Sequence, residues 1–438
     1  MRRLEDKYHD VLAVIGVHSA KFMAERSEAG LRHAVRRHEI RHPVVNDADF
    51  RVWSQYAVRA WPTLYFVSPG GKIVFKHEGE LDFESFDRVL SMMVDEYDSL
   101  GLLDRRPLHN EREESPEGIL SYPGKVLADA TTDTLFIADT NHNRILETSL
   151  DGRIRREWGD GEAGIVDGDQ RSARFNHPQG MALHGGNLYV ADTENHAVRA
   201  LRLEGGVVET IAGTGDQAHS YAPSGAPGKH AALSSPWDVC VVYDVLYIAM
   251  AGTHQIWSLE LSSGLVRPFA GSGREGIEDG PISQAGLAQT SGLTTDGARL
   301  YFADSETSAI RWVDVASGLV QTIVGLGLFE FGDEDGVGDA VRLQHPLDVE
   351  CHEGALYFAD TYNNKIKKLD PTSRASHTWL GSGERGLMDG LNVSASFNEP
   401  SGLSAADGTL YIADANNHAI RAADLETGVV STIEITEL

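Results

Sequence analysis

Short runs of alternating apolar and polar residues fill most of this chain, and turn residues separate the runs. One run recurs six times as Leu, an aromatic residue, an apolar residue and Ala, followed by Asp or, once, by Met. Its copies end at positions 139, 192, 250, 304, 360 and 414. Spacings of 53, 58, 54, 56 and 54 residues are typical of an array whose units each bury a face against the next. The pattern predicts a repeat domain over residues 118–438.

The second copy shows what one unit contains. It starts at Pro178 and runs through a turn at Gly185-Gly186, the strand that ends at Asp192, a further strand and a last strand that ends near Gly213. Four short strands separated by turn signals are the unit of a propeller blade. Equivalent starts lie at Pro123, Pro178, Pro236, Ser291, Pro346 and Pro400. We therefore expect a six-bladed β-propeller.

The first 98 residues have a different, mixed pattern. Their periodicity predicts strands at 11–17, 64–67 and 73–77 and helices at 27–38, 49–56 and 83–97. Residues 99–117 are charged and lack apolar periodicity, so we expect a linker there. The predicted fold class is thus multidomain, with an α/β domain at 1–98 and an all-β propeller at 118–438.

The order of elements in residues 1–98 resembles the thioredoxin-like fold, in its redoxin branch. The resemblance is carried by Pro62 directly before the penultimate strand and by a Gly-Gly-Lys hairpin after it. In that family the proline is cis and faces the active cysteines, so the resemblance makes Pro62 a cis-proline candidate.

The same resemblance marks a missing part. The family has a central strand and a Cys-x-x-Cys segment before the position where this chain begins, and residues 1–115 contain no cysteine. The resemblance therefore implies a thioredoxin-like domain that is incomplete at its N-terminus and that, as written, has no thiol for disulfide exchange. We expect the native protein to start upstream of Met1; the alternative is that the remaining strands pair differently.

The repeats resemble the NHL repeat family. Most copies match Leu-Tyr-Ile-Ala-Asp-x-x-Asn-His-x-Ile-Arg, followed by Thr-Ile-Ala-Gly-x-Gly. The third copy departs from it at Met250 and the fourth at Ser308. A thioredoxin-like domain followed by this propeller resembles the family of NHL-repeat-containing protein 2 and its bacterial relatives.

Composition narrows the function classes. Among 438 residues, 45 Gly and 15 Pro suit a turn-rich fold. The two cysteines, Cys240 and Cys351, allow no disulfide framework and no four-ligand Cys/His zinc site, and we expect both to be inert strand residues. No metal site and no cofactor are predicted.

Charge is distributed unevenly between the two parts. Residues 1–115 carry 17 basic and 20 acidic residues, whereas the remainder carries 21 and 45. An acidic propeller repels phosphate backbones, which argues against nucleic acid as a partner. No apolar run reaches the length of a membrane span and the N-terminus has no signal-peptide core, so we expect a soluble protein that stays in the cytoplasm.

Strand direction predicts where a binding surface lies. The turn between the second and third strands of a blade and the connection to the next blade lie at the same end of the propeller, here called the loop end, where binding residues usually reside. From the turns we expect there His142, Asn195, His196, His254, Asn363, Asn364, Asn417 and His418. Beside the inner strands we expect His177, Gln179, Trp237, Asp238, His345, Asp348 and Glu399.

The repeated aspartates have a structural interpretation. An Asp before Thr-x-Asn suits a tight turn whose carboxylate accepts backbone N–H groups. The connections repeat Gly-x-x-Gly-x-x-Asp-Gly, for example over residues 161–168, and turn chemistry explains this motif better than a calcium or phosphate site. Asp139, Asp192, Asp304, Asp360 and Asp414 are expected to be structural.

Three functions remain open. The leading hypothesis is a non-enzymatic binding or scaffolding protein that recruits a peptide or protein at the loop end. The alternative is a thiol-disulfide oxidoreductase whose Cys-x-x-Cys lies upstream of Met1. The third is a metal-dependent lyase or hydrolase at the propeller mouth, with His177 and His345 as the candidate ligands.

Overall fold

The computed structural model describes residues 1–79, 82–106, 118–218 and 225–437. The chain divides into two compact units, residues 1–115 and residues 116–438. The expected linker at 99–117 falls in part on residues 107–117, which lie outside the described residues. No helix in the described part of the chain is long and apolar enough to cross a bilayer.

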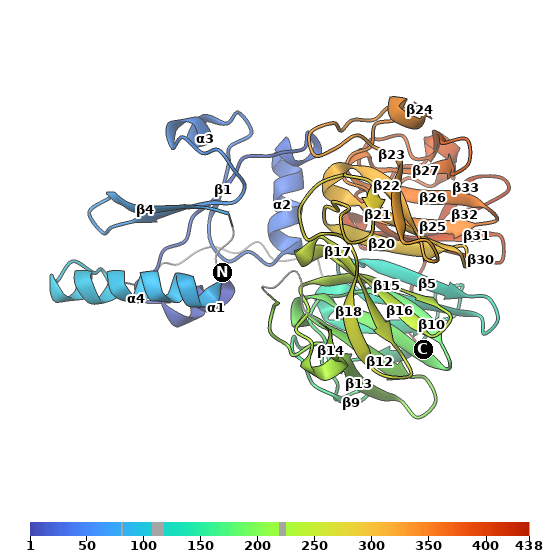
Figure 1. The fold of residues 1–438 in the computed structure, drawn as a ribbon, viewed down its shortest axis with the longest axis horizontal. Coiled ribbons are helices and arrows are strands. Elements are labelled where there is room, and N and C mark those ends of the chain that lie inside the picture. Colours follow the sequence, from blue (N-terminus) through green and yellow to red (C-terminus); the bar gives the residue numbers. More distant parts are fainter. Residues whose placement is uncertain (80–81, 107–117, 219–224, 438) are drawn as a thin grey trace. The chain divides into compact units, whose positions relative to one another are not determined.

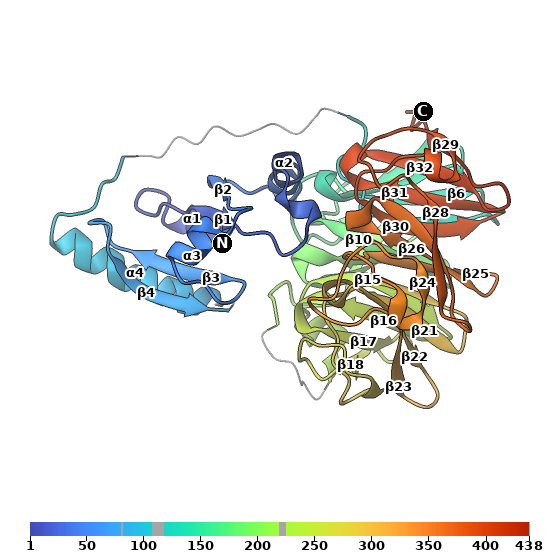
Figure 2. The same ribbon diagram turned by 90° about the horizontal axis from the view of Figure 1, so that it is seen from above.

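The described residues of the first unit form four α-helices, one short 3₁₀ helix (Ala24–Arg26) and two two-stranded sheets, whose arrangement Figure 2 shows. Its helices are α1 (Arg2–Lys7), α2 (Glu28–Arg37), α3 (Arg51–Gln55) and α4 (Phe83–Ser99). Its strands are β1 (Gly16–His18) and β2 (Val44–Asn46), which pair in parallel, and β3 (Thr63–Val67) and β4 (Ile73–Glu78), which form an antiparallel hairpin. The Trp61–Pro62 peptide bond is cis. Among the described residues no strand joins the two sheets.

The strand predicted at 11–17 is wrong in most of its length. Val11 and Leu12 lie in a turn after α1, where both backbone N–H groups bond to the carbonyl of Tyr8. Their side chains pack against the cluster that contains Leu4 and Leu90. The apolar run therefore reflects packing beside α1 and α4, and only its end becomes β1.

The second unit is a β-propeller of six sheets, whose colours progress from cyan to red around the ring in Figure 1. Blade 1 contains β5 (Lys125–Asp129), β6 (Thr134–Asp139), β7 (Arg144–Thr148) and β8 (Ile154–Trp158). Blade 2 contains β10 (Pro178–His184), β11 (Asn187–Asp192), β12 (Ala197–Arg202) and β13 (Val207–Ala212). Blade 3 contains β15 (Pro236–Val242), β16 (Val245–Met250), β17 (Gln255–Glu260) and β18 (Leu265–Ala270).

The other three blades repeat this arrangement. Blade 4 contains β20 (Thr290–Thr295), β21 (Arg299–Asp304), β22 (Ala309–Asp314) and β23 (Leu319–Val324). Blade 5 contains β25 (Asp348–His352), β26 (Ala355–Asp360), β27 (Lys365–Asp370) and β28 (Ala375–Leu380). Blade 6 contains β30 (Pro400–Ala406), β31 (Thr409–Asp414), β32 (Ala419–Asp424) and β33 (Val429–Ile433).

Blades 2 to 6 each have a fifth strand that the sequence pattern did not predict. These strands are β9 (Gly168–Asp169), β14 (Ala226–Pro227), β19 (Gly280–Pro281), β24 (Gly336–Val337) and β29 (Gly390–Leu391). Each pairs with the outermost strand of its blade. The connections thus cover the outer sheet edges, which would otherwise expose unpaired backbone groups.

Six apolar clusters form the core of the propeller, one at each junction between neighbouring blades. The last of them joins blade 6 to blade 1 and includes Ile433 and Ile435. In addition, the backbone of Thr436 forms a parallel bridge with Arg153 beside β8. The chain end therefore covers the outer edge of blade 1, as the fifth strands do in the other blades.

Candidate binding site at the loop end of the propeller

The repeated aspartate of each blade is buried at the turn after its second strand. Asp139, Asp192, Asp304, Asp360 and Asp414 are all 0 % exposed. Each accepts the backbone N–H of a residue in the preceding connection at 2.6–2.8 Å. These five carboxylates are thus bonded inside the fold.

The turn with the buried aspartate forms the corner of its blade. In four blades a buried cation pairs with the aspartate at this corner. In blade 2, Arg199 is 0 % exposed and donates to Asp192 at 2.8 Å and to Asp167 at 3.0 Å. Asp167 also accepts from the Thr210 backbone and hydroxyl. Asp167 is the aspartate of the Gly-x-x-Gly-x-x-Asp-Gly motif, so the motif attaches the connection to its blade. Arg311, Lys367 and Arg421 occupy the equivalent position in blades 4, 5 and 6.

The third blade lacks both charges of this pair. Met250 replaces the aspartate, and Trp257 replaces the arginine seven residues later. Its indole N–H donates to the Gln255 side chain at 3.0 Å, and the Ser234 backbone N–H points to the Met250 sulfur. The joint loss of both charges avoids an unpaired buried ion.

A ring of six hydrogen bonds joins each blade to the next at the loop end. In each bond a side chain directly after the turn accepts a backbone N–H from the next blade, at 2.9–3.2 Å. The acceptors are Asn143, His196, His254, Ser308, Asn364 and His418, and the donors are His177, Ser235, Gln289, His345, Glu399 and Tyr122 respectively. The last bond, from Tyr122 to His418, closes the ring between blade 6 and blade 1.

Both members of every ring bond have left-handed backbone conformations. Their φ angles lie between 48° and 57°. Asn and His are several-fold enriched in this region among non-glycine residues. The Asn-His signature of the repeat therefore combines a residue that tolerates the turn with an acceptor that reaches the next blade.

A second buried cluster lies at the propeller axis. Lys125 of blade 1 is 2 % exposed and contacts Asp238 of blade 3 at 3.2 Å and Asp348 of blade 5 at 2.7 Å. Glycine occupies the same strand position in blades 2, 4 and 6, and a β-carbon on Gly292 would lie 2.5 Å from the Asp348 carboxylate. Charged residues and glycines thus alternate around the axis.

The carboxylates of this axial cluster are bound by neighbouring strands as well as by Lys125. Asp238 accepts the Leu293 N–H and Asp348 accepts the Leu403 N–H. One layer deeper, Glu350 accepts the Ala405 N–H at 3.0 Å. Burial raises the pKa of Glu350 to about 8, because it disfavours the charged form.

The corner of blade 1 differs from all others. Its Asp139 binds the His142 ring at 2.8 Å and the Arg144 guanidinium at 2.8 Å. The ring bond of this blade uses Asn143 instead, so His142 stays outside the ring and its side chain is 37 % exposed. His142, Arg144 and Gly161 line a cavity of about 230 Å³.

Comparison with known proteins agrees with this geometry. Residues 175–201 and 397–422 match the NHL repeat. The chain contains an NHL-repeat β-propeller. Over 99% of its length it is 42% identical to SUPPRESSOR OF QUENCHING 1 of Arabidopsis thaliana and 40% identical to human NHL repeat-containing protein 2. It covers 43% and 65% of these two proteins, and so spans less than two thirds of either.

A solved structure supports the propeller fold alone. An auxiliary nutrient binding protein from Bacteroides thetaiotaomicron superposes with a TM-score of 0.51 at 14% identity. The match covers 72% of this chain and 70% of that one.

Most residues predicted for the loop end of the NHL propeller have structural contacts there. His196, His254 and His418 accept ring bonds, and His177, His345 and Glu399 donate them through their backbones. Asn195, Asn363 and Asn417 bond to the corner aspartates. Asp238 and Asp348 lie in the axial cluster. The expected residues thus divide among several structural roles.

Four of the predicted side chains lie in environments that differ from one another. The His345 ring stacks on Tyr362 at 4.6 Å, and the His177 ring lies 3.0 Å from the Asn176 side chain. Gln179 lies next to Gly124, where a β-carbon would collide with its amide. Trp237 is half-buried on β15.

Sequence reasoning missed the two buried residues that complete the axis, Lys125 and Glu350. A usable signal existed for Lys125, because it occupies a position that is otherwise Gly or Asp in every copy. Both cysteines lie nearby on inner strands, where burial raises the pKa of Cys351 to about 11 and raises that of Cys240 further.

Proposed function

We propose that this chain is a binding or scaffolding protein whose NHL propeller holds a peptide segment of a partner protein at the corner of blade 1. The observation that carries the proposal is the exposure of His142. It is the loop-end histidine of blade 1, it makes no ring bond, and it lines a cavity with Arg144. NHL propellers generally mediate protein interactions, which agrees with this assignment.

The size and chemistry of the cavity favour binding over catalysis. At about 230 Å³ it is smaller than the pockets that enclose small-molecule ligands and suits one side chain of a peptide. Its lining residues His142, Arg144 and Gly161 include no hydroxyl or thiol nucleophile. His142 and Arg144 offer a polar wall to an acceptor group such as a carbonyl or carboxylate.

We further propose that the first unit is a thioredoxin-like domain that serves as a second recruitment module. Its order of parallel β1 and β2, the β3–β4 hairpin and the final helix α4 supports that assignment. Residues 1–115 contain no cysteine.

The oxidoreductase alternative depends on a Cys-x-x-Cys upstream of Met1 and stays a prediction, because the two cysteines of this chain do not supply the chemistry. The thiols of Cys240 and Cys351 have raised pKa values and are neutral at physiological pH, so neither is a nucleophile for disulfide exchange. Among the described residues no group of three or more His, Cys, Asp or Glu side chains is placed to hold a metal ion. His177 and His345 therefore belong to no such group.

The proposal is tested by selecting peptides from a phage-displayed library on the immobilised full chain and titrating a selected peptide by calorimetry. His142→Ala is expected to weaken binding about tenfold, the loss of one charge-assisted or buried polar contact. His254→Asn is the matched control, because Asn fills the same ring position in blades 1 and 5, and it should bind like the wild type. Equal affinity of His142→Ala, or no selected peptide, would overturn the proposal.

A further inference from the structure

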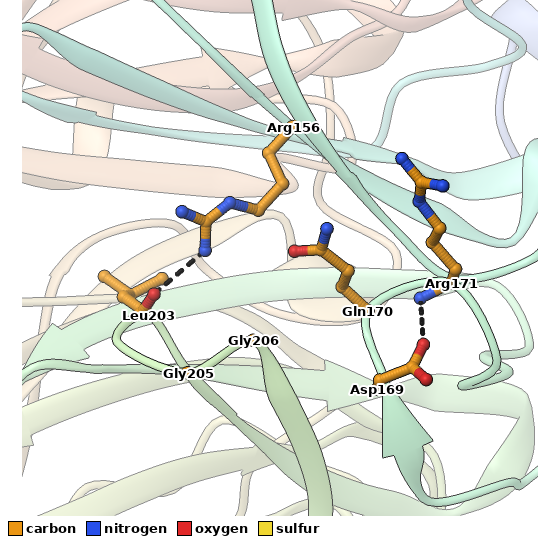
Figure 3. A pocket seen from close by; sticks show the side chains of 7 residues that line it. All are labelled: Arg156, Asp169, Gln170, Arg171, Leu203, Gly205 and Gly206. Carbon is orange, nitrogen blue, oxygen red and sulfur yellow. Dashed lines mark hydrogen bonds between the residues drawn. The ribbon is translucent and has the colours of Figure 1, made fainter.

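A second polar cavity lies on the outer rim, where blade 1 meets blade 2. It measures about 470 Å³ and is lined by Arg156 of β8, by residues 169–171 and by the turn at Gly205-Gly206 (Figure 3). That turn joins the third and fourth strands of blade 2. It therefore lies at the end of the propeller opposite to His142, because successive strands run in opposite directions. The two sites can be tested separately.

Arg156 is held in place by three neighbours. Its guanidinium donates to the Leu203 carbonyl at 2.9 Å, lies 3.5 Å from Glu147 and sits 5.0 Å from the Trp158 ring centre. An arginine ordered in this way loses little side-chain freedom when it binds a ligand. Its guanidinium has five N–H donors, which is more than these neighbours occupy, so N–H groups remain available to a ligand.

Gln170 and Arg171 form the opposite wall. The backbone of Gln170 is fixed on both sides, because its N–H bonds to the Gly206 carbonyl and its carbonyl accepts the Gly159 N–H. Figure 3 shows its amide between the Arg156 and Arg171 side chains. Within the described residues, no hydrogen bond or ion pair links either the Gln170 amide or the Arg171 guanidinium to another side chain.

The acidic residue of the cavity is already bonded. The Asp169 carboxylate accepts the backbone N–H groups of Arg171 at 2.8 Å and Ser172 at 3.1 Å. It therefore faces its own turn, as Figure 3 shows, and leaves the two arginines as the cations of the cavity. Two arginines thus face this cavity, with Asp169 and Glu147 beside them, on a propeller whose residues 116–438 carry 21 basic and 45 acidic residues.

Comparison of the repeats shows that the pair Gln170-Arg171 has no counterpart at the other junctions between blades. The backbone bond from Gln170 to Gly206 recurs in the other blades, which identifies the equivalent positions. The pairs found there are Gly228-Lys229, Ile282-Ser283, Gly338-Asp339 and Asn392-Val393. An amide followed by arginine occurs only between blades 1 and 2, although the scaffold is common to all five junctions.

From this geometry we infer that the rim cavity binds an anionic peptide segment, with Arg156 and Arg171 pairing with a carboxylate or phosphate group and the Gln170 amide donating to it. Arginine forks match both groups with paired hydrogen bonds. The net negative charge of the propeller disfavours binding of such a peptide to its acidic surfaces.

The test uses the full chain and fluorescence anisotropy with three labelled peptides of otherwise equal sequence. One carries consecutive glutamates, one a single phosphoserine and one glutamines as the uncharged reference. Arg171→Ala is expected to weaken binding of the glutamate or phosphoserine peptide about tenfold, and added salt should weaken it further. Arg156→Ala should have an effect of similar size.

Arg267→Ala is the matched control. Arg267 of blade 3 is equivalent to Arg156, because Arg267 pairs with Ser258 as Arg156 pairs with Glu147. At the junction of blade 3 with blade 4, however, Ile282 and Ser283 take the places of Gln170 and Arg171, and Arg267 contacts Glu260. Its removal should leave anisotropy unchanged. The inference is overturned if all three peptides bind alike, if neither anionic peptide binds, or if Arg171→Ala and Arg267→Ala bind as the wild type does. Whichever of the two anionic peptides binds more tightly shows whether the cavity prefers a carboxylate or a phosphate group.

Discussion

Asp192 and Arg199 show how one pair of residues fixes a blade. Both side chains are 0 % exposed, and burial raises the pKa of Asp192 to about 6 even beside the guanidinium. Such a pair contributes little net stability, but removal of one partner leaves a buried charge without compensation. The third blade, with Met250 and Trp257, retains neither charge.

We therefore expect Asp192→Asn to lower the free energy of unfolding of the propeller by about 3–5 kcal/mol. The matched control is Asp167→Asn, which removes the half-exposed partner of the same Arg199 and should cost about 1 kcal/mol or less. Urea unfolding followed by tryptophan fluorescence measures both. The double variant Asp192→Met with Arg199→Trp, copied from blade 3, should regain part of the loss. Equal costs for the two Asn variants would contradict this role.

Glu350 predicts a pH dependence. Its pKa is raised to about 8 by burial and by nearby Asp348, whereas an unfolded glutamate titrates near 4.5. The folded state thus holds a proton that the unfolded state releases between these values, and stability falls as pH rises through this window, by at most about 1.4 kcal/mol per pH unit.

Glu350→Gln removes this contribution and keeps the side-chain shape. The free energy of unfolding of the variant, measured relative to that of the wild type, is expected to rise by about 2 kcal/mol or more from pH 5 to pH 8. Urea midpoints at a series of pH values measure the difference, and Glu157→Gln, at a half-exposed position, is the control. A constant difference across this range would show that Glu350 is ionised in the fold.

At the scale of elements, the blade as a four-stranded unit could be predicted, because alternation and turn residues are local signals. The fifth strands could not, since each has two residues and pairs with a strand more than 35 positions later in the chain. The sequence predicts turn chemistry for the Gly-x-x-Gly-x-x-Asp-Gly motif. Its aspartate additionally bonds to the outer strand, as Asp167 does with Thr210.

The ring bonds predict that Asn and His are interchangeable at one place in every blade. Asn364 accepts the N–H of the buried Glu399 at 2.9 Å, at a φ of 53°. Asn364→Ala should cost about 2–3 kcal/mol, because it leaves that N–H without its acceptor and places alanine in a left-handed conformation. Asn364→His should retain most of the stability, since His fills this position in blades 2, 3 and 6. Thermal unfolding compares them, and an equal loss in both variants would contradict the ring.

At the scale of the whole molecule, the number of blades followed from the repeat, whereas the contacts that close the ring did not. Tyr122 and His418 are 296 positions apart, and Lys125 and Asp238 are 113 apart. Partners so distant in sequence become visible only once the propeller is closed. For the same reason the histidines of the repeat suggested a binding surface, although most of them join one blade to the next.

The exception is the corner of blade 1, where Asn143 makes the ring bond and leaves His142 beside a cavity. We therefore assign stability to the repeated corner positions and propose binding at the unrepeated one. The side chains of the ring bonds and that of His142 all lie at the loop end. They therefore differ in function and not in location.

The most direct test measures peptide affinity and thermal midpoint on the same two variants, His142→Ala and Asn364→Ala, with the peptide selected on the full chain. We predict that His142→Ala loses about tenfold in affinity and keeps its thermal midpoint, whereas Asn364→Ala loses stability and keeps its affinity below its midpoint. If His142→Ala bound the peptide as the wild type does, or if Asn364→Ala lost binding while fully folded, the division between ring and site would be contradicted.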